Sequence, residues 1–259
     1  MTLVADAALA IPGLHEDADR TSGATEHEIE TIVPARRVAF TPRRRSELAN
    51  RLLNILVASI ALAVLAPLLV LIGLLVAATS PGPIIYVQTR VGVDRRHRRR
   101  PVDLGCDRRT RDIGGKAFHI YKFRSMVANA ERNGAVWARQ GDARVTPLGR
   151  VLRASRLDEL PQLVNVLIGD MNIVGPRPER PRIFAQLRES IDEYPRRQLG
   201  RPGITGWAQI NHRYDTCLDD VKVKVRYDLE YLSRRQSLLE DVRIMLKTIP
   251  VMLFARGSM

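Results

Sequence analysis

An uncharged, strongly apolar run over residues 52–78 constrains this chain more than any other feature of its sequence. Its only polar side chains are those of Asn54 and Ser59. A helix needs about 20 apolar residues to cross the hydrocarbon core of a bilayer, so the run is long enough. A core helix of a soluble domain seldom stays apolar on every face over such a length. The run therefore predicts a membrane helix.

Pro67 lies just past the middle of the run and predicts a bend there. Proline removes a backbone hydrogen bond, and its ring clashes with the preceding turn. Each half is then too short to cross a hydrocarbon core of about 30 Å by itself. Arginines flank the run on both sides: Arg36, Arg37, Arg43, Arg44, Arg45 and Arg51 before it, and Arg90, Arg95, Arg96, Arg98, Arg99 and Arg100 after it.

The flanking charges indicate how the bent helix is placed. Positively charged residues favour the cytoplasmic side of a membrane, and here both flanks carry them. A single span would put one flank on the unfavourable side. A helix over residues 52–79 that enters the bilayer, bends at Pro67 and returns satisfies both flanks. We therefore expect a re-entrant helix hairpin.

The rest of the chain divides around this helix. Residues 1–35 are polar and acidic without hydrophobic periodicity, which is typical of a disordered tail. Residues 36–51 form a basic juxtamembrane segment, and the prolines and glycine of residues 80–83 end the helix. Residues 80–259 are expected to form a cytoplasmic domain. Within it, the arginine-rich insert 94–115 is either a solvated loop or a contact for anionic lipid headgroups.

The charge balance narrows the class of partner. Lys and Arg total 41 against 28 Asp and Glu, a net charge of +13, which predicts anionic partners. Aromatic residues make up only 5% of the chain and no nucleic-acid-binding motif is present, so we expect no nucleic acid. The two cysteines, Cys106 and Cys217, are far apart, which excludes a disulfide scaffold and argues against a cysteine-rich zinc site.

Two later segments have helical periodicity. Apolar residues from Leu160 to Leu167 recur at helical spacing, and Gly169 is expected to end this helix. Residues 238–254 combine a helical apolar pattern with Arg243 and Lys247. That pattern suits either a core helix or a helix lying flat on a membrane, and the sequence leaves both open.

The run SRLDELPQ, residues 155–162, contains the candidate catalytic pair Asp158 and Glu159. Pro161 is tolerated only in the first turn of a helix, so both acids fall near a helix start, where acids commonly act as caps. Basic residues elsewhere suggest more than capping: Lys122, Arg124, Arg153 and Arg177. Arg177 lies between two prolines and is therefore suited to hold a phosphate.

A helix start surrounded by cations is an anion site, and carboxylates inside it would repel the anion. A divalent cation that bridges carboxylates and phosphates removes this conflict, and Mg²⁺ is the usual one. Carboxylates, Mg²⁺ and arginines around a phosphate are the groups that phosphoryl transfer uses. An aspartate can also be the nucleophile and form an acyl phosphate. We therefore expect Asp158 and Glu159 to be catalytic and to hold Mg²⁺.

Residues 48–257 resemble the bacterial sugar transferase family, the monotopic polyprenyl-phosphate phosphoglycosyl transferases. The runs that match, in the family's order, are SPGPIIYVQTRVG, KAFHIYKFRSM, RLDELPQLVNVLIGDMNIVGPRPERP, RPGITGWAQIN and DLEYL followed by S-X-X-X-D. The resemblance implies an α-dominated α+β fold: a re-entrant helix hairpin with a cytoplasmic catalytic domain of short strands and interfacial amphipathic helices. It also places the active site at the cytoplasmic face of the bacterial inner membrane.

The reaction that the resemblance implies is a ping-pong transfer of a sugar 1-phosphate. Asp158 matches the nucleophile that attacks a UDP-sugar and releases UMP, before undecaprenyl phosphate takes up the sugar phosphate and starts exopolysaccharide or other glycoconjugate synthesis. Glu159 matches the second acid, whose role stays open between metal support and proton transfer. Lys122, Arg153 and Arg177 match basic positions that would contact phosphate. Further candidate ligand residues, each equally open to a structural role, are Arg124, Arg201 and Gln209.

Some features stay open. The family commonly has serine before the helix proline, whereas this chain has Ala66, which makes the geometry of the bend less certain. Trp207 is either a core residue or a platform for a ligand. The alternative function is a non-enzymatic, membrane-anchored scaffold or anion-binding module that meets anionic membrane lipids. Neither the identity of the sugar nor the oligomeric state can be inferred from the sequence.

Overall fold

The computed structural model describes residues 46–94, 114–128, 130, 142–212, 217–233 and 237–253. The expected tail at residues 1–35 lies outside the described residues. So do residues 36–45 of the basic juxtamembrane segment and nearly all of the arginine-rich insert 94–115. These three predictions therefore remain predictions.

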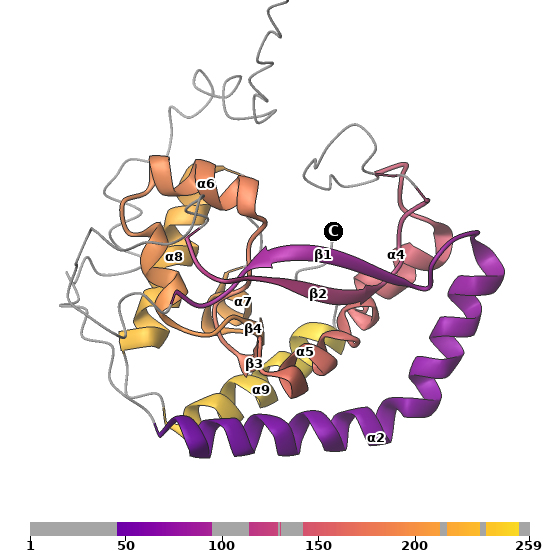
Figure 1. The fold of residues 1–259 in the computed structure, drawn as a ribbon, viewed down its shortest axis with the longest axis horizontal. Coiled ribbons are helices and arrows are strands. Elements are labelled where there is room, and N and C mark those ends of the chain that lie inside the picture. The colour runs from indigo at the N-terminus through magenta and orange to yellow at the C-terminus, as the bar shows by residue number, and fades with distance from the viewer. Residues whose placement is uncertain are drawn as a thin grey trace, which may run out of the picture.

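The apolar run forms helix α2, Glu47–Thr79, which is long and apolar enough to cross a membrane. It begins five residues before the predicted start, because Ser46 caps it by accepting a hydrogen bond from the Ala49 amide at 3.3 Å. The helix runs along one side of the molecule and then changes direction (Figure 1). Pro67 lies within the helix, and a proline is the usual cause of such a bend.

Both halves of α2 pack against the same domain. In the first half, Asn54 and Ala58 are buried, and the Asn54 side-chain oxygen accepts a hydrogen bond from the Ile173 amide at 2.6 Å. In the second half, Ile72 and Val76 pack against Phe123. The opposite side of α2 is exposed and apolar; its exposed large side chains are Leu48, Leu52, Leu56, Ile60, Val64, Val70, Leu71, Leu74 and Leu75.

An antiparallel ribbon follows α2 and crosses the middle of the molecule (Figure 1). It consists of β1, Ile85–Val91, and β2, Ala117–Phe123, with Tyr86 opposite Lys122 and Arg90 opposite Phe118. Because side chains alternate along a strand, these four residues share one face of the ribbon. That face is more buried than the other, so Arg90 and Lys122 are directed toward the interior.

The acid pair lies between two short helices. Helix α4, Pro147–Ala154, is followed by the 3₁₀ helix η1, Leu157–Glu159, and then by α5, Gln162–Ile168. The two acids thus sit in a separate 3₁₀ turn rather than in the first turn of α5, for which Pro161 is the N-cap. The predicted end of this helix is confirmed: Gly169 has a φ of 99°, a conformation that favours glycine.

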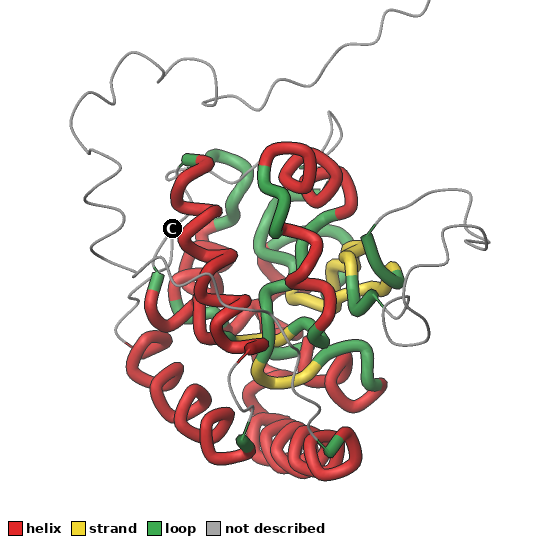
Figure 2. The backbone as a smooth tube through the Cα atoms, turned by 90° about the vertical axis from the view of Figure 1, so that its left-hand side faces the viewer, coloured by secondary structure: helices red, strands yellow, loops and turns green. Residues whose placement is uncertain are grey.

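Helices predominate in the described chain, and its strands are few and short (Figure 2). Strands β3, Asn172–Val174, and β4, Gly203–Thr205, form a short parallel pair. The remaining elements are α6, Pro181–Ser190; η2, Tyr194–Leu199; α7, Trp207–Asn211; α8, Leu218–Ser233; and α9, Leu238–Leu253. A helix-rich α+β fold with a few short strands is therefore confirmed.

Helix α9 has both a buried face and an exposed apolar face. Ile244 is fully buried in the core, together with the side chain of Asp241. Another face of the same helix is exposed and apolar, with Leu239 at 81% and Leu246 at 61% exposure. One face is therefore core, and the other is free to contact an apolar environment.

Candidate active site

A tight backbone turn brings the two acids to the site. Arg156, which precedes η1, has a φ of 55°, the only positive φ among the described residues other than glycine. This left-handed conformation costs a non-glycine residue roughly 1 kcal/mol, and such outliers often mark functional sites. The turn reverses the chain after α4 and leaves Asp158 and Glu159 each only 7% exposed.

Glu159 is held by two cations. Arg177 donates from Nη1 to Oε2 at 3.1 Å and from Nη2 to Oε1 at 2.5 Å, and Lys122 donates to Oε1 at 2.8 Å. Burial by itself would raise the pKa of Glu159, but the charges of Arg177 and Lys122 outweigh it and hold that pKa well below its usual range. Glu159 therefore stays ionised near neutral pH and orients the side chains of Arg177 and Lys122.

Asp158 has the opposite environment. Its carboxylate makes no hydrogen bond or ion pair with any residue that the structure describes. Burial raises the pKa of Asp158 to about 6, although the charges of Lys122 and Arg153 partly oppose the shift. The environments of Asp158 and Glu159 shift their pKa values in opposite directions, and carboxyl groups that differ in this way commonly have different roles in a site. The unpaired one can react, while the paired one supports the site.

Asp158→Asn is expected to raise the free energy of unfolding near neutral pH by about 1–3 kcal/mol. Because the folded-state pKa of about 6 exceeds the ordinary 3.8, the folded protein binds more protons between these values and loses stability as the pH rises. Asparagine carries no charge and removes this loss. Thermal unfolding in detergent at about pH 7.5 and at about pH 4 checks it. An equal gain at both pH values would contradict the prediction.

Arg90 and Glu179 belong to the site, although the sequence did not single them out for it. Arg90 donates from Nη1 to the Pro178 carbonyl at 3.0 Å and to Glu179 Oε1 at 3.2 Å. Its charge also lowers the pKa of Lys122, after the larger effect of burial, so it lies within electrostatic reach of the acid pair. The sequence signal for this residue is the run QTR in SPGPIIYVQTRVG, in which Arg90 is otherwise visible only as a charge flanking the membrane helix.

The contacts of Arg124 favour its structural alternative. Its guanidinium donates to the carbonyls of Val76 at 3.3 Å, of Pro83 at 2.8 Å, and of Ser80. These carbonyls lie at the end of α2 or just beyond it, where helix carbonyls lack partners within the helix. Arg124 therefore ties the end of α2 to the ribbon.

The remaining candidate residues lie in different surroundings. Arg153 lies at the end of α4, and its charge lowers the pKa of Asp158. Gln209 donates to the Ile204 carbonyl at 3.1 Å, and Arg201 is half-buried just before β4. Neither Arg201 nor Gln209 bonds to the acid pair within the described ranges. The structure thus brings Lys122, Arg153 and Arg177 around the acids.

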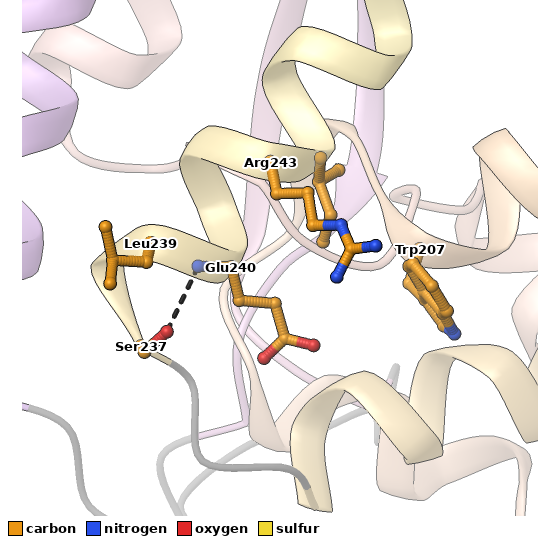
Figure 3. Close-up of a pocket in the computed structure, with 6 residues that line it drawn as sticks. Trp207, Ser237, Leu239, Glu240 and Arg243 are labelled. Carbon is orange, nitrogen blue, oxygen red and sulfur yellow. Dashed lines mark hydrogen bonds between the residues drawn. The ribbon is translucent and has the colours of Figure 1, made fainter.

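Trp207 lies at a cavity separate from the acid pair. The cavity has a volume of about 300 Å³ and is lined by Trp207, Ser237, Leu239, Glu240, Arg243 and Ile244 (Figure 3). The indole donates to Glu230 at 2.9 Å, and Lys247 lies 5.7 Å from the ring centroid. A polar partner on another helix fixes the orientation of the ring.

Of the two acids, only Asp158 has carboxylate oxygens available to coordinate Mg²⁺ within the described structure. Both oxygens of Glu159 are occupied by Arg177 and Lys122, whereas those of Asp158 bond to no residue in the described part of the chain. Within the described residues no group of three or more His, Cys, Asp or Glu could hold a metal ion. Mg²⁺ commonly takes one or two carboxylates plus substrate phosphates. The residues present therefore fit an Mg²⁺ ion that Asp158 would hold together with phosphate oxygens of a substrate.

Comparisons with known proteins identify the family of the chain. Residues 45–255 match the family model described as bacterial sugar transferase. A UDP-N-acetylgalactosamine-undecaprenyl-phosphate N-acetylgalactosaminephosphotransferase of Aeromonas hydrophila is 38% identical over 233 residues, covering 90% of this chain and 48% of that protein. A UDP-glucose:undecaprenyl-phosphate glucose-1-phosphate transferase of Escherichia coli is 40% identical over 206 residues, covering 77% of this chain and 40% of that protein.

A relative of more similar length comes from Caulobacter vibrioides. This UDP-glucose:undecaprenyl-phosphate glucose-1-phosphate transferase is 37% identical over 214 residues, covering 82% of this chain and 72% of that protein. The chain therefore spans about half the length, or less, of the Aeromonas and Escherichia relatives and most of the length of the Caulobacter one. Since the family match includes α2, the ribbon and the acid pair, the chain belongs to the bacterial sugar transferase family.

Proposed function

We propose that the chain transfers a sugar 1-phosphate from a UDP-sugar to undecaprenyl phosphate and releases UMP. The observation that carries this proposal is the buried Asp158 carboxylate, which pairs with no described residue and is influenced by the charges of Lys122, Arg153 and Arg177. The relatives named for this reaction support it. A further relative, the exopolysaccharide production protein PSS of Rhizobium leguminosarum, supports a place at the start of exopolysaccharide synthesis; it is 36% identical over 195 residues.

The first half-reaction forms a covalent intermediate on Asp158. A carboxylate oxygen attacks the phosphorus bonded to the sugar. The bond from that phosphorus to the bridging oxygen breaks, and UMP leaves with the electron pair. In the second half-reaction an oxygen of the lipid phosphate attacks the same phosphorus. The bond to Asp158 then breaks and the carboxylate is regenerated, so the two steps balance without an additional reactant.

Glu159 determines which donors remain for the substrate. A guanidinium has five N–H donors and an ammonium has three. Glu159 takes two from Arg177 and one from Lys122, so donors remain on both groups for phosphate oxygens. This arrangement places positive charge where negative charge develops in the transition state. Glu159 therefore supports the site by positioning cations, rather than by moving a proton.

We also propose that Asp158 would hold Mg²⁺ when the donor substrate binds. A bound Mg²⁺ supplies charge neutralisation at the phosphates during transfer. The free oxygens of Asp158 and the engagement of Glu159 with Arg177 and Lys122 support this assignment. Asp158 would hold the metal, while Glu159 positions Arg177 and Lys122, so both acids would help to keep positive charge near the substrate phosphates.

We propose that α2 is re-entrant and that the active site faces the cytoplasm at the inner membrane. Both halves of α2 pack against one domain, and Arg51 donates to the carbonyls of Val166 and Leu167 on α5. A domain that holds both halves of a bent helix lies on one side of the bilayer. The exposed apolar face of α9, beside Arg243 and Lys247, supports contact with the membrane surface and its anionic lipids.

Cysteines placed at Glu47 and at Val87 should report the same side of the membrane. Glu47 is exposed at the start of α2, and Val87 is 49% exposed on the ribbon after it. In a background of Cys106→Ser and Cys217→Ser, a membrane-impermeant maleimide is expected to label both in inside-out vesicles and neither in right-side-out vesicles. Opposite accessibility of the two positions would show that α2 spans the membrane.

UMP release tests the proposed function. The full chain in membranes is incubated with Mg²⁺, undecaprenyl phosphate and a panel of UDP-sugars that includes glucose, galactose and their N-acetylated forms. We expect sustained UMP release with at least one sugar, and about one UMP per enzyme when the lipid phosphate is omitted. Mass spectrometry of the lipid-free reaction should find a phosphosugar on Asp158. Absence of UMP with every donor would favour a non-enzymatic scaffold.

A further inference from the structure

The main chain at Arg177 is fixed from several directions. The Pro176 carbonyl accepts from the Gly203 amide at 3.0 Å, and the Gly175 amide donates to the Thr205 carbonyl at 2.9 Å. A Cβ at Gly175 would lie 2.3 Å from the Arg201 carbonyl oxygen, so this close approach requires glycine. The loop that presents Arg177 is therefore attached closely to the β3–β4 pair.

Arg197 holds the same loop from the interior. Its Nη2 donates to the Arg177 carbonyl at 3.1 Å, its Nη1 donates to the Tyr194 hydroxyl at 2.8 Å, and its Nε donates to Asp228 Oδ2 at 2.6 Å. The side chains of Arg197 and Asp228 are only 1% and 3% exposed. One guanidinium thus joins η2, α8 and the active-site loop.

A gain in folding stability does not by itself explain the buried Arg197–Asp228 ion pair. Removing two charges from water costs several kcal/mol each, and apolar replacements of similar size are often neutral or stabilising. Arg197 donates a hydrogen bond to the main-chain carbonyl of Arg177, and an apolar side chain has no donor that could replace it. Arg90 supports the other side of the loop through the Pro178 carbonyl and Glu179.

We propose that Arg197, held by Asp228 and Tyr194, is a positioning residue for Arg177. The described hydrogen bonds of Arg197 do not include the acid pair; Arg197 fixes the peptide from which the Arg177 side chain extends. Because prolines flank Arg177, its backbone has little freedom, and a fixed peptide determines where the guanidinium points. A misplacement of about 1 Å at such a group can cost about 100-fold in rate. This inference rests on the proposed transfer reaction.

Arg197→Lys is the principal test. Lysine can keep the charge pair with Asp228, but it has no fork that reaches Asp228, Tyr194 and the Arg177 carbonyl together. We expect kcat/KM for the UDP-sugar to fall about 10- to 100-fold. In an Arg177→Ala background, Arg197→Lys should cause a further loss of less than about threefold, because the group that it positions is gone. Equal losses in both backgrounds, or wild-type kinetics of the single variant, would overturn the proposal.

The neighbouring arginine supplies a matched control. Arg196 is about half exposed and pairs only with Glu193 at 2.8 Å within the described contacts. Arg196→Lys should leave kinetics and thermal unfolding unchanged. A loss as large as that of Arg197→Lys would show that any change in this segment is harmful and would overturn the positioning role.

Tyr194→Phe covers the case in which Arg197→Lys does not fold. It removes one hydroxyl and leaves the Arg197–Asp228 pair intact. The expected loss in kcat/KM is about 3- to 10-fold, with a thermal midpoint close to that of the wild type, and the loss should vanish in the Arg177→Ala background. Unchanged kinetics of the folded Tyr194→Phe protein would overturn the proposal.

Hydrogen exchange separates this inference from the proposed function. Arg197→Lys should increase amide exchange about tenfold in the peptide that covers residues 175–180, without a change in peptides from α5. This readout needs no turnover. If the wild type releases no UMP but the exchange difference is present, the proposed function fails and the attachment of the Arg177 loop stands. If exchange is unchanged, the positioning role fails whatever the activity.

Discussion

Asp158→Asn is expected to lower UMP release by about ten-thousand-fold or more, the range seen when a covalent nucleophile is removed. Asparagine has nearly the same shape, but its amide oxygen cannot form the acyl phosphate. Because the Asp158 side chain bonds to no described residue, the substitution breaks no hydrogen bond or ion pair among those residues. The loss should therefore occur in a protein that is folded, membrane-bound and at least as stable as the wild type.

The control is an exposed acid with an ordinary partner. Asp219 is 59% exposed on α8 and pairs with Lys222 at 2.7 Å. Asp219→Asn should leave UMP release within about twofold of wild type, since exposed ion pairs contribute little. If Asp158→Asn kept transfer activity, or if lipid-free incubation with the donor left the Asp158 side chain unmodified, the nucleophile assignment would be wrong.

Arg177→Ala should have the second largest effect, a fall in kcat/KM of about 100- to 1,000-fold. It removes the forked donor that we propose to contact the phosphates, and among the described residues it leaves the buried Glu159 side chain bonded to Lys122 alone. Breaking a buried ion pair on one side commonly costs about 3–5 kcal/mol. Because Arg177 is 30% exposed, solvent should reduce that cost to about 1–3 kcal/mol. Steady-state kinetics and thermal unfolding measure the two effects.

A double variant separates the two losses. Arg177→Ala combined with Glu159→Gln removes the buried negative charge as well, so part of the stability should return while activity stays low. Arg182→Ala, at an exposed position on α6, is the matched control and should behave like the wild type. Unchanged kinetics of Arg177→Ala would remove this residue from the site. Restored activity in the double variant would show that Arg177 serves only to neutralise Glu159.

The sequence by itself determined the features that depend on local pattern. An uncharged run of sufficient length around Pro67 predicted the membrane helix, because hydropathy and proline geometry act within one segment. The order of the matching runs determined the family and placed Asp158 and Glu159 in it. Gly169 was predicted as a helix end for the same local reason, since a left-handed residue is readily provided by glycine.

Only the tertiary structure decided what each charged residue does. Lys122, Glu159 and Arg177 come from three separate segments, and their pairing depends on how the ribbon, η1 and the β3–β4 pair pack together. The same packing leaves Asp158 without a bonded partner among the described residues, directs Arg124 to carbonyls at and just beyond the end of α2, and buries Arg197 against Asp228. Charge pattern along the chain cannot distinguish these roles, because the pKa and the partner of a charge are determined by burial and by neighbours distant in sequence.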